Sequence, residues 1–157
     1  MKLARRPFVL GLFTAIGSVG TRSTMASKPA SKVLFVCQFG TAKSAIAREV
    51  FRQRARVRGI NVSVFSRGIT PGDHVSPALK ARLTEDGIDF AHDGLHRLSR
   101  KDIKAADIVV TFNPLPATML PKDLRDWSAV PSVNDDYPAA SADLRRRIDA
   151  LLDSLAK

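Results

Sequence analysis

The chain has 157 residues, 45% of them hydrophobic, and a formal net charge of +10. This length suits one domain with a substantial core, and the composition excludes a disordered or fibrous protein. The charge suggests a nucleic-acid partner, but four basic residues precede Ser27, and the sequence without them carries about +6. The basic cluster at 48–58 has helical spacing and no recognition motif, which favours a solvated helix face over a nucleic-acid groove.

The first 26 residues have the pattern of a targeting segment. They combine a basic start with a modest apolar run at 8–19, which is too short for a membrane span of about 20 residues. The pair Arg5 and Arg6 resembles a twin-arginine export signal, so we expect a periplasmic or exported protein without stable membrane association after processing. The alternative is a cytoplasmic protein whose translation starts at Met25.

The rest of the sequence alternates between strand and helix patterns. Short apolar or alternating runs predict strands, and apolar residues at three- and four-residue steps predict helices. The predicted strands are 32–37, 62–66 and 107–112, and the predicted helices are 44–58, 76–86, 99–105 and 141–155. This alternation predicts an α/β domain in which helices cover both faces of a parallel sheet.

The only cysteine, Cys37, ends the first predicted strand, and residues 37–44, here named the Cys37 loop, lead into a helix. Ligands of parallel sheets bind beyond the carboxyl ends of the strands. Backbone N–H groups of such a turn and the helix N-terminus stabilise a bound oxyanion, and they also stabilise a thiolate. We therefore expect Cys37 to act as a nucleophile toward phosphorus, with Gly40 permitting a tight turn and Ser44 donating to the sulfur. The alternative is that Cys37 is a small buried apolar side chain.

The stretch CQFGTAKS resembles the signature loop of the low-molecular-weight protein tyrosine phosphatase superfamily, in which Cys and five further residues precede Arg-Ser. The resemblance continues through VSVFSRGITPGDHVSPALKARLTEDGIDF and LSRKDIKAADIVVTF. It implies a three-layer, flavodoxin-like α/β domain over 27–157 with a four-stranded parallel sheet. It also implies a reaction without metal or other cofactor, and phosphate binding by the loop residues Gln38, Phe39, Gly40, Thr41, Ala42, Lys43 and Ser44.

Three positions of the Cys37 loop depart from the family pattern. Lys43 replaces the arginine. The ammonium of lysine is a mobile point charge, and it should stabilise the phosphoryl transition state less well than the planar guanidinium of arginine. Gly40 replaces the asparagine that stiffens the family's loop. Ala42 replaces the second loop cysteine, so the protective disulfide partner is absent from this position.

The resemblance also implies a general acid, an aspartate in an Asp-Pro-Tyr stretch before the last helix. Asp135 matches it by position, and Asp136, which replaces the proline, is an alternative acid. The two carboxylates could equally serve as a helix cap. Tyr137 would border the pocket or pack in the core. The three histidines lack ligand spacing and are interpreted as surface residues.

Three functions fit these residues. The first is a phosphatase that forms a phosphocysteine and acts on a phosphorylated protein, through phosphotyrosine, or on a small aryl phosphate. The second is an arsenate reductase, which would need an external thiol because the sequence has no second cysteine. The third is an oxyanion-binding or regulatory module that has lost efficient turnover. The sequence predicts no nucleic-acid partner.

Overall fold

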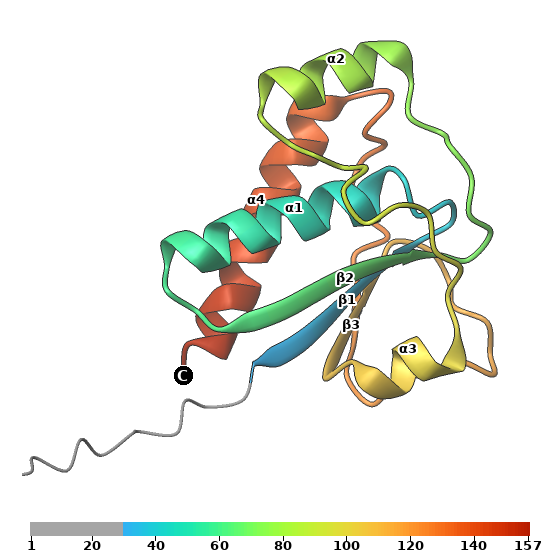
Figure 1. The fold of residues 1–157 in the computed structure, drawn as a ribbon, viewed down its shortest axis with the longest axis vertical. Helices are drawn as coiled ribbons and strands as arrows, with labels where there is room; N and C mark the ends of the chain where they lie inside the picture. Colours follow the sequence, from blue (N-terminus) through green and yellow to red (C-terminus); the bar gives the residue numbers. More distant parts are fainter. Residues whose placement is uncertain (1–29) are drawn as a thin grey trace, which may run out of the picture.

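The computed structural model describes residues 30–157, which form a sheet with helices on both faces (Figure 1). The predicted targeting segment, residues 1–26, lies outside the described residues. None of the helices within 30–157 combines the length and apolar character that a membrane span requires.

The elements follow one another in the order β1 (Ser31–Cys37), α1 (Lys43–Val57), β2 (Val62–Gly68), α2 (Pro77–Glu85), α3 (Arg100–Ala105), β3 (Ile108–Thr111), β4 (Leu124–Asp126) and α4 (Tyr137–Leu155). The strands form one sheet in the order β2-β1-β3-β4, and every pairing is parallel. The predicted three-layer α/β fold with a four-stranded parallel sheet is therefore confirmed.

The central strand β1 is buried on both faces, so its successive side chains enter two different cores. Val33, Phe35 and Cys37 belong to the larger core, which also contains residues of α1, α2 and α4. Leu34 and Val36 belong to the smaller core beside α3. Figure 1 shows α1 and α4 on one side of the sheet and α3 on the other. The alternation places the Cys37 side chain on the α1 side.

Two parts of the fold differ from the sequence prediction. The last helix begins at Tyr137, four residues before the predicted start, because the Asp136 side chain accepts a hydrogen bond from the Ala139 N–H at 3.0 Å and caps it. The family resemblance implied a fourth strand, but the residues that form it, β4, were not predicted. Its three residues are all exposed, so they lack the apolar run that marks the other strands.

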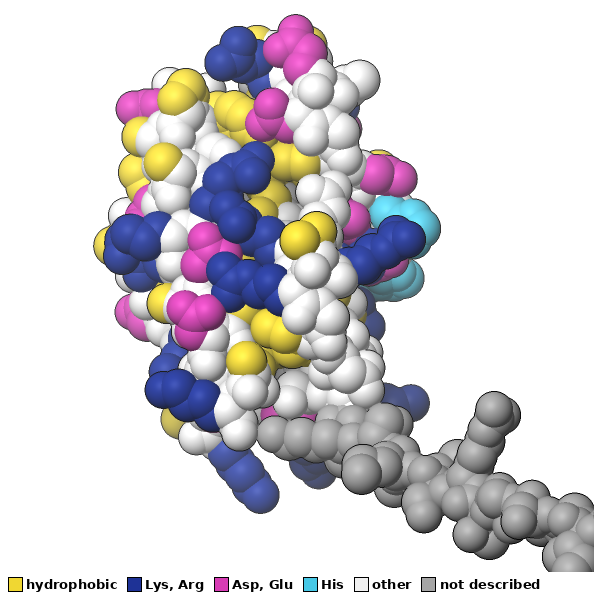
Figure 2. Space-filling model, turned by 90° about the vertical axis from the view of Figure 1, so that its left-hand side faces the viewer, with side chains coloured by type: hydrophobic (Ala, Val, Ile, Leu, Met, Phe, Trp, Pro, Cys, Tyr) yellow, Lys and Arg dark blue, Asp and Glu magenta, His cyan; other side chains and the backbone are white. Residues whose placement is uncertain are grey.

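The sequence suggested that the basic cluster at 48–58 is a solvated helix face. In the structure, part of this cluster is buried. Arg48 is completely buried, because its guanidinium finds partners inside the protein. Arg58 pairs with Asp149 and Asp153 of α4, and Arg54 also pairs with Asp149. Figure 2 shows basic and acidic side chains interspersed on the face where α1 ends and α4 passes.

The cap of α4 gives a stability prediction. We expect Asp136→Ala to lower the free energy of unfolding by about 1 kcal/mol, because the Ala139 N–H loses its acceptor. The matched control is Asp135→Ala at the exposed neighbouring carboxylate, with an expected change within about 0.5 kcal/mol. Urea unfolding of the two variants measures the difference, and equal effects would contradict the assignment of the cap.

Candidate active site

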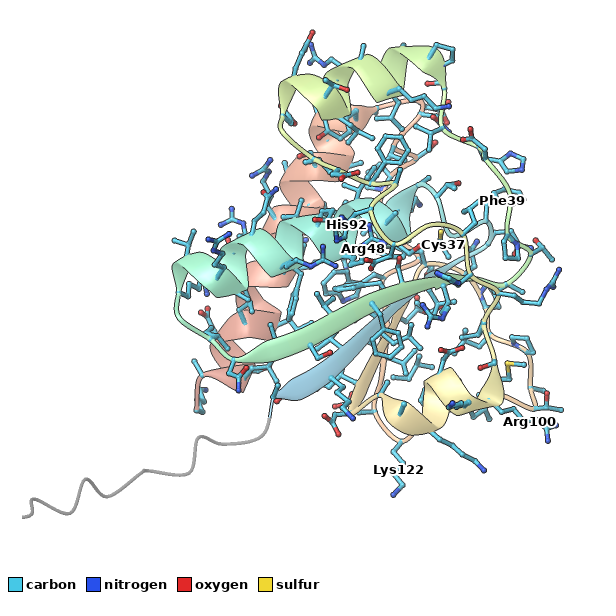
Figure 3. All side chains as sticks on the ribbon, in the orientation of Figure 1. Cys37, Phe39, Arg48, His92, Arg100 and Lys122 are labelled. Carbon is cyan, nitrogen blue, oxygen red and sulfur yellow. The ribbon has the colours of Figure 1, made fainter. Side chains whose placement is uncertain are left out.

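Cys37 is the last residue of the central strand β1 (Figure 3). Its sulfur has two polar neighbours. The Gly40 N–H donates a hydrogen bond to Cys37 Sγ at 3.2 Å. The Ser44 Oγ lies 3.0 Å from the same sulfur, and Ser44 belongs to the first turn of α1. A backbone N–H and a hydroxyl therefore lie against one sulfur, whose residue is buried.

Gly40 makes this geometry possible. Its φ is +76°, a region that side-chain-bearing residues rarely adopt. A Cβ at Gly40 would lie 2.8 Å from the Gly68 nitrogen, and a Cβ at Gly68 would lie 2.8 Å from the Phe39 carbonyl oxygen. The Cys37 loop is therefore packed backbone to backbone against the end of β2. The predicted role of Gly40 in a tight turn is confirmed.

Residues that follow β2 and β3 hold the rest of the loop. The Gln38 N–H donates to Asn113 Oδ1 at 2.9 Å, and Asn113 comes shortly after β3. The Thr41 hydroxyl donates to the Gly72 carbonyl at 2.7 Å, in the segment after β2. Sequence reasoning did not identify Asn113 as part of the site. Its position just beyond the carboxyl end of a buried parallel strand is the signal that could have found it.

Lys43, the residue in place of the family's arginine, lies at the first position of α1. Its Nζ donates a hydrogen bond to the Val130 carbonyl at 2.5 Å. Partial burial lowers the pKa of the Lys43 ammonium from its ordinary value, and the neighbouring Cys37 partly offsets this shift. In this arrangement Lys43 links the Cys37 loop to the segment before α4.

A pocket of about 220 Å³ lies beside the Cys37 loop. It is lined by Cys37, Gln38, Phe39, Ala42, Lys43, Asn113, Ser132, Val133 and Asn134. The other predicted phosphate-binding residues, Gly40, Thr41 and Ser44, are buried and hold the loop in shape. Anion binding by residues 38–44 stays a prediction.

His74 was interpreted as a surface residue, and it is exposed. Its ring nevertheless stacks on Phe39, with centroids 3.5 Å apart, and its backbone N–H donates to Thr41 Oγ1 at 3.3 Å. His74 thus packs against one side of the Cys37 loop. No group of three or more His, Cys, Asp or Glu side chains within residues 30–157 is arranged to hold a metal ion.

The segment before α4 contributes different residues from those expected. Ser132, Val133 and Asn134 line the pocket, whereas Asp135, the predicted acid, is exposed and is not among the lining residues. Asp136, the alternative acid, is the cap of α4. The catalytic role of Asp135 stays a prediction.

Tyr137 packs in the core and does not border the pocket. Its side chain is buried, and its hydroxyl donates to Asp86 at 2.6 Å, next to the end of α2. Burial, together with this hydrogen bond, raises the pKa of Tyr137 to about 12. Of the two possibilities for Tyr137 that the sequence left open, the structure therefore supports packing.

Arg48 is a further residue that sequence reasoning placed wrongly. It follows Ser44 by one helical turn, and its guanidinium donates to Ser66 Oγ at 2.8 Å and to the Phe90 carbonyl at 3.2 Å. It also pairs with Glu49 at 3.0 Å and with Asp93 at 3.3 Å. These contacts tie α1 to β2 and to the segment after α2, beside the Cys37 loop (Figure 3).

Solved structures of similar fold include both phosphatases and arsenate reductases. YfkJ from Bacillus subtilis has a TM-score of 0.69 and 18% identity, over 83% of this chain and 97% of its own. A low molecular weight protein tyrosine phosphatase from T. tengcongensis has a TM-score of 0.61 and 23% identity, over 80% of this chain and 100% of its own. A thioredoxin-dependent arsenate reductase from Corynebacterium glutamicum has a TM-score of 0.63 and 24% identity, over 83% of this chain and 64% of its own.

The match in sequence is more specific than these likenesses in fold. Residues 32–150 match the family described as low molecular weight phosphotyrosine protein phosphatase. The match begins at the second residue of β1 and ends within α4, so it includes Cys37, the Cys37 loop and the whole pocket. The chain belongs to the low molecular weight phosphotyrosine protein phosphatase family.

Proposed function

We propose that this protein is a cysteine-dependent phosphatase that hydrolyses aryl phosphate esters, phosphotyrosine among them, through a phosphocysteine intermediate. One observation carries the proposal. Cys37 lines a pocket, and its sulfur accepts the Gly40 N–H and lies within hydrogen-bonding distance of the Ser44 hydroxyl. A sulfur held in this way is a nucleophile that an anion can reach.

The reaction has two displacements at phosphorus. In the first, the Cys37 thiolate forms an S–P bond while the P–O bond to the aryl group breaks. In the second, water attacks the phosphorus and the thiolate leaves, which releases inorganic phosphate. Ser44, 3.0 Å from the sulfur, can donate a hydrogen bond to the departing thiolate. The proton donor that the resemblance implies, Asp135, stays a prediction.

Lys43 supplies the positive charge of the pocket wall. Its ammonium contacts the Val130 carbonyl, and a bound phosphoryl group would compete with that carbonyl for the same donor. Phosphoryl transfer depends mainly on positioning and on charge stabilisation, so this one lysine carries a large share of the catalysis.

Arsenate reduction is a second candidate function. The Cys37 thiolate could attack arsenic as it attacks phosphorus, and an arsenate reductase is among the proteins of similar fold. The sequence contains one cysteine, so an external thiol would have to supply the reducing equivalents. A third candidate, an oxyanion-binding module, is favoured only by the replacement of arginine with Lys43.

The first prediction concerns Cys37. We expect the purified protein to hydrolyse para-nitrophenyl phosphate, and Cys37→Ser to lower that activity by more than about 1,000-fold because the nucleophile is lost. Iodoacetamide should alkylate Cys37 at neutral pH, and phosphate or vanadate should slow the alkylation. An unreactive thiol whose labelling ignores both anions would sink the proposal, and arsenate reduction with added thiol in the absence of phosphatase activity would favour the second candidate.

The second prediction concerns Lys43. We expect Lys43→Arg to raise kcat for para-nitrophenyl phosphate, because the planar guanidinium of arginine can donate to two phosphoryl oxygens in the transition state. One added charge-assisted hydrogen bond of about 1.5–3 kcal/mol corresponds to roughly 10- to 100-fold if fully realised.

The control variant is Lys43→Ala, which should lose activity. If Lys43→Arg were inactive while Lys43→Ala remained active, the loop would serve something other than phosphoryl transfer. If the wild type and both variants bound phosphate without turnover, the binding-module function would replace the phosphatase.

A further inference from the structure

A groove runs beside α3, on the side of the sheet away from α1 (Figure 1). It consists of two hollows of about 460 and 450 Å³, which adjoin because Ile103, Lys104 and Leu120 line both of them. Lys122 lines only the first hollow and Arg100 only the second, and Figure 3 shows both residues on the α3 side of the sheet. This feature, here named the α3 groove, shares no lining residue with the pocket beside the Cys37 loop.

The cations of the α3 groove have no acidic partner. Arg100, Lys104 and Lys122 are exposed, and none of them forms an ion pair with a residue in the range 30–157. Most arginines in that range do pair, as Arg58 does with two carboxylates of α4. Neighbouring cations without partners raise the electrostatic potential of a surface and favour the approach of an anionic molecule.

The carboxylates near the groove are engaged in other contacts. Asp107 lines the groove, and its side chain accepts the Lys32 backbone N–H at 2.8 Å. Asp102 pairs with Arg67 at 2.9 Å and takes part in the cap of α3. The lining residues therefore carry three cationic side chains and one carboxylate, which leaves a net charge of +2.

The groove also presents apolar surface to solvent. The side chain of Leu120, which lines both hollows, is 70% exposed. Met119 and Pro121 are half-buried beside it, and Ile103 is buried against the core. Exposed apolar surface bordered by polar groups is typical of a protein-binding site. The lining residues include no aromatic side chain, so the groove offers no surface on which nucleic-acid bases could stack.

We propose that the α3 groove binds an acidic segment of a partner protein. Carboxylates of that segment pair with Arg100, Lys104 and Lys122, and an apolar side chain of the segment covers Leu120. Charge complementarity favours this occupant, and a concave groove fits an extended peptide better than the flat surface of a membrane. Residues 1–29 of the chain contain no acidic residue, so they do not supply the complementary charge. The proposal is independent of the phosphatase function, because the two sites share no residue.

The experiment selects peptides from a random-sequence display library on the full-length protein, and fluorescence anisotropy then measures the Kd of the selected peptide. We expect the selected sequences to be enriched in Asp and Glu, with apolar residues between them. Binding should weaken between about 50 mM and about 500 mM NaCl, because salt screens the attraction between charges. Cys37→Ser should bind the selected peptide as the wild type does, whatever its effect on catalysis.

Charge reversal tests the cations of the groove. Lys104→Glu combined with Lys122→Glu should raise the Kd of the selected peptide by about 10-fold or more, because each reversal replaces an attraction by a repulsion. The matched control is Arg82→Glu. Arg82 is exposed and, like Lys104, is the basic residue in the last turn of its helix. Its helix, α2, lies at the opposite end of the molecule from α3 (Figure 1), so the Kd should change by less than about 2-fold.

A second variant tests the apolar contact. Leu120→Ser should raise the Kd by roughly 5-fold or more, because the partner then buries less apolar surface. The control is Val57→Ser at the end of α1, where the valine is 88% exposed and distant from the groove, and it should leave the Kd unchanged. All substituted side chains are exposed, and circular dichroism of each variant checks that it folds as the wild type does.

The other outcomes overturn the proposal. A library that yields no saturable binder, or a loss of affinity in Arg82→Glu equal to that of the groove reversal, would show that the groove does not bind an acidic segment. Phosphatidylserine vesicles or single-stranded DNA that bound through Lys104 and Lys122, without any peptide binder, would assign the groove to a membrane or to nucleic acid. Dimerisation that light scattering detects and that the groove reversal abolishes would make a second copy of the chain the occupant.

Discussion

The contact between the backbones of Gly40 and Gly68 is the constraint on which the site depends. It folds the Cys37 loop onto the end of β2 so closely that neither glycine has room for a Cβ. Because Gly40 takes a positive φ there, its N–H points at the Cys37 sulfur. The end of β2 thus fixes the conformation of the Cys37 loop, and that conformation places the Gly40 N–H against the Cys37 sulfur. A side chain at either glycine would disturb the sulfur without touching it.

Segments that follow the neighbouring strands also hold the other parts of the pocket in place. Asn113 after β3 and the segment after β2 hold the Cys37 loop through its backbone and the Thr41 side chain. The segment before α4 is held in turn by Asn134. These groups are neutral, so they shape the pocket without adding charge. Only Lys43 balances the charge of a bound anion among the lining residues, and it is the position at which the sequence departs most from the family pattern.

Sequence reasoning predicted the parts of the site whose residues lie close together in the sequence. Cys37, Gly40 and Ser44 lie in one short stretch between a buried strand and a helix, and local geometry nearly determines their arrangement. The order of these elements was predictable for the same reason, because apolar runs mark the first three strands and apolar periodicity marks α1 and α4, whereas all three residues of β4 are exposed. The resemblance to a known family added the number of strands.

The parts that depend on long-range contacts were not predictable. Nothing in the sequence shows that Asn134 bonds the segment after β2, that Lys43 reaches the Val130 carbonyl, or that Arg48 is buried among five polar partners. Sequence reasoning left Asp136 open between acid and helix cap, because a carboxylate before a helix can serve as either, and the Ala139 contact shows that it caps α4. A run of arginines with helical spacing predicts a solvated helix face, because the sequence does not show which acidic side chains pair with them.

The central claim is that Cys37 carries the phosphoryl group between the two displacements. The most direct measurement is mass spectrometry of the peptide that contains Cys37 after acid quenching of the protein during turnover of 2,4-dinitrophenyl phosphate. The account predicts that a fraction of this peptide bears one phosphoryl group on Cys37. Turnover that continues in Cys37→Ser, or turnover by the wild type with no phosphoryl group on Cys37 at any quench time, would contradict it.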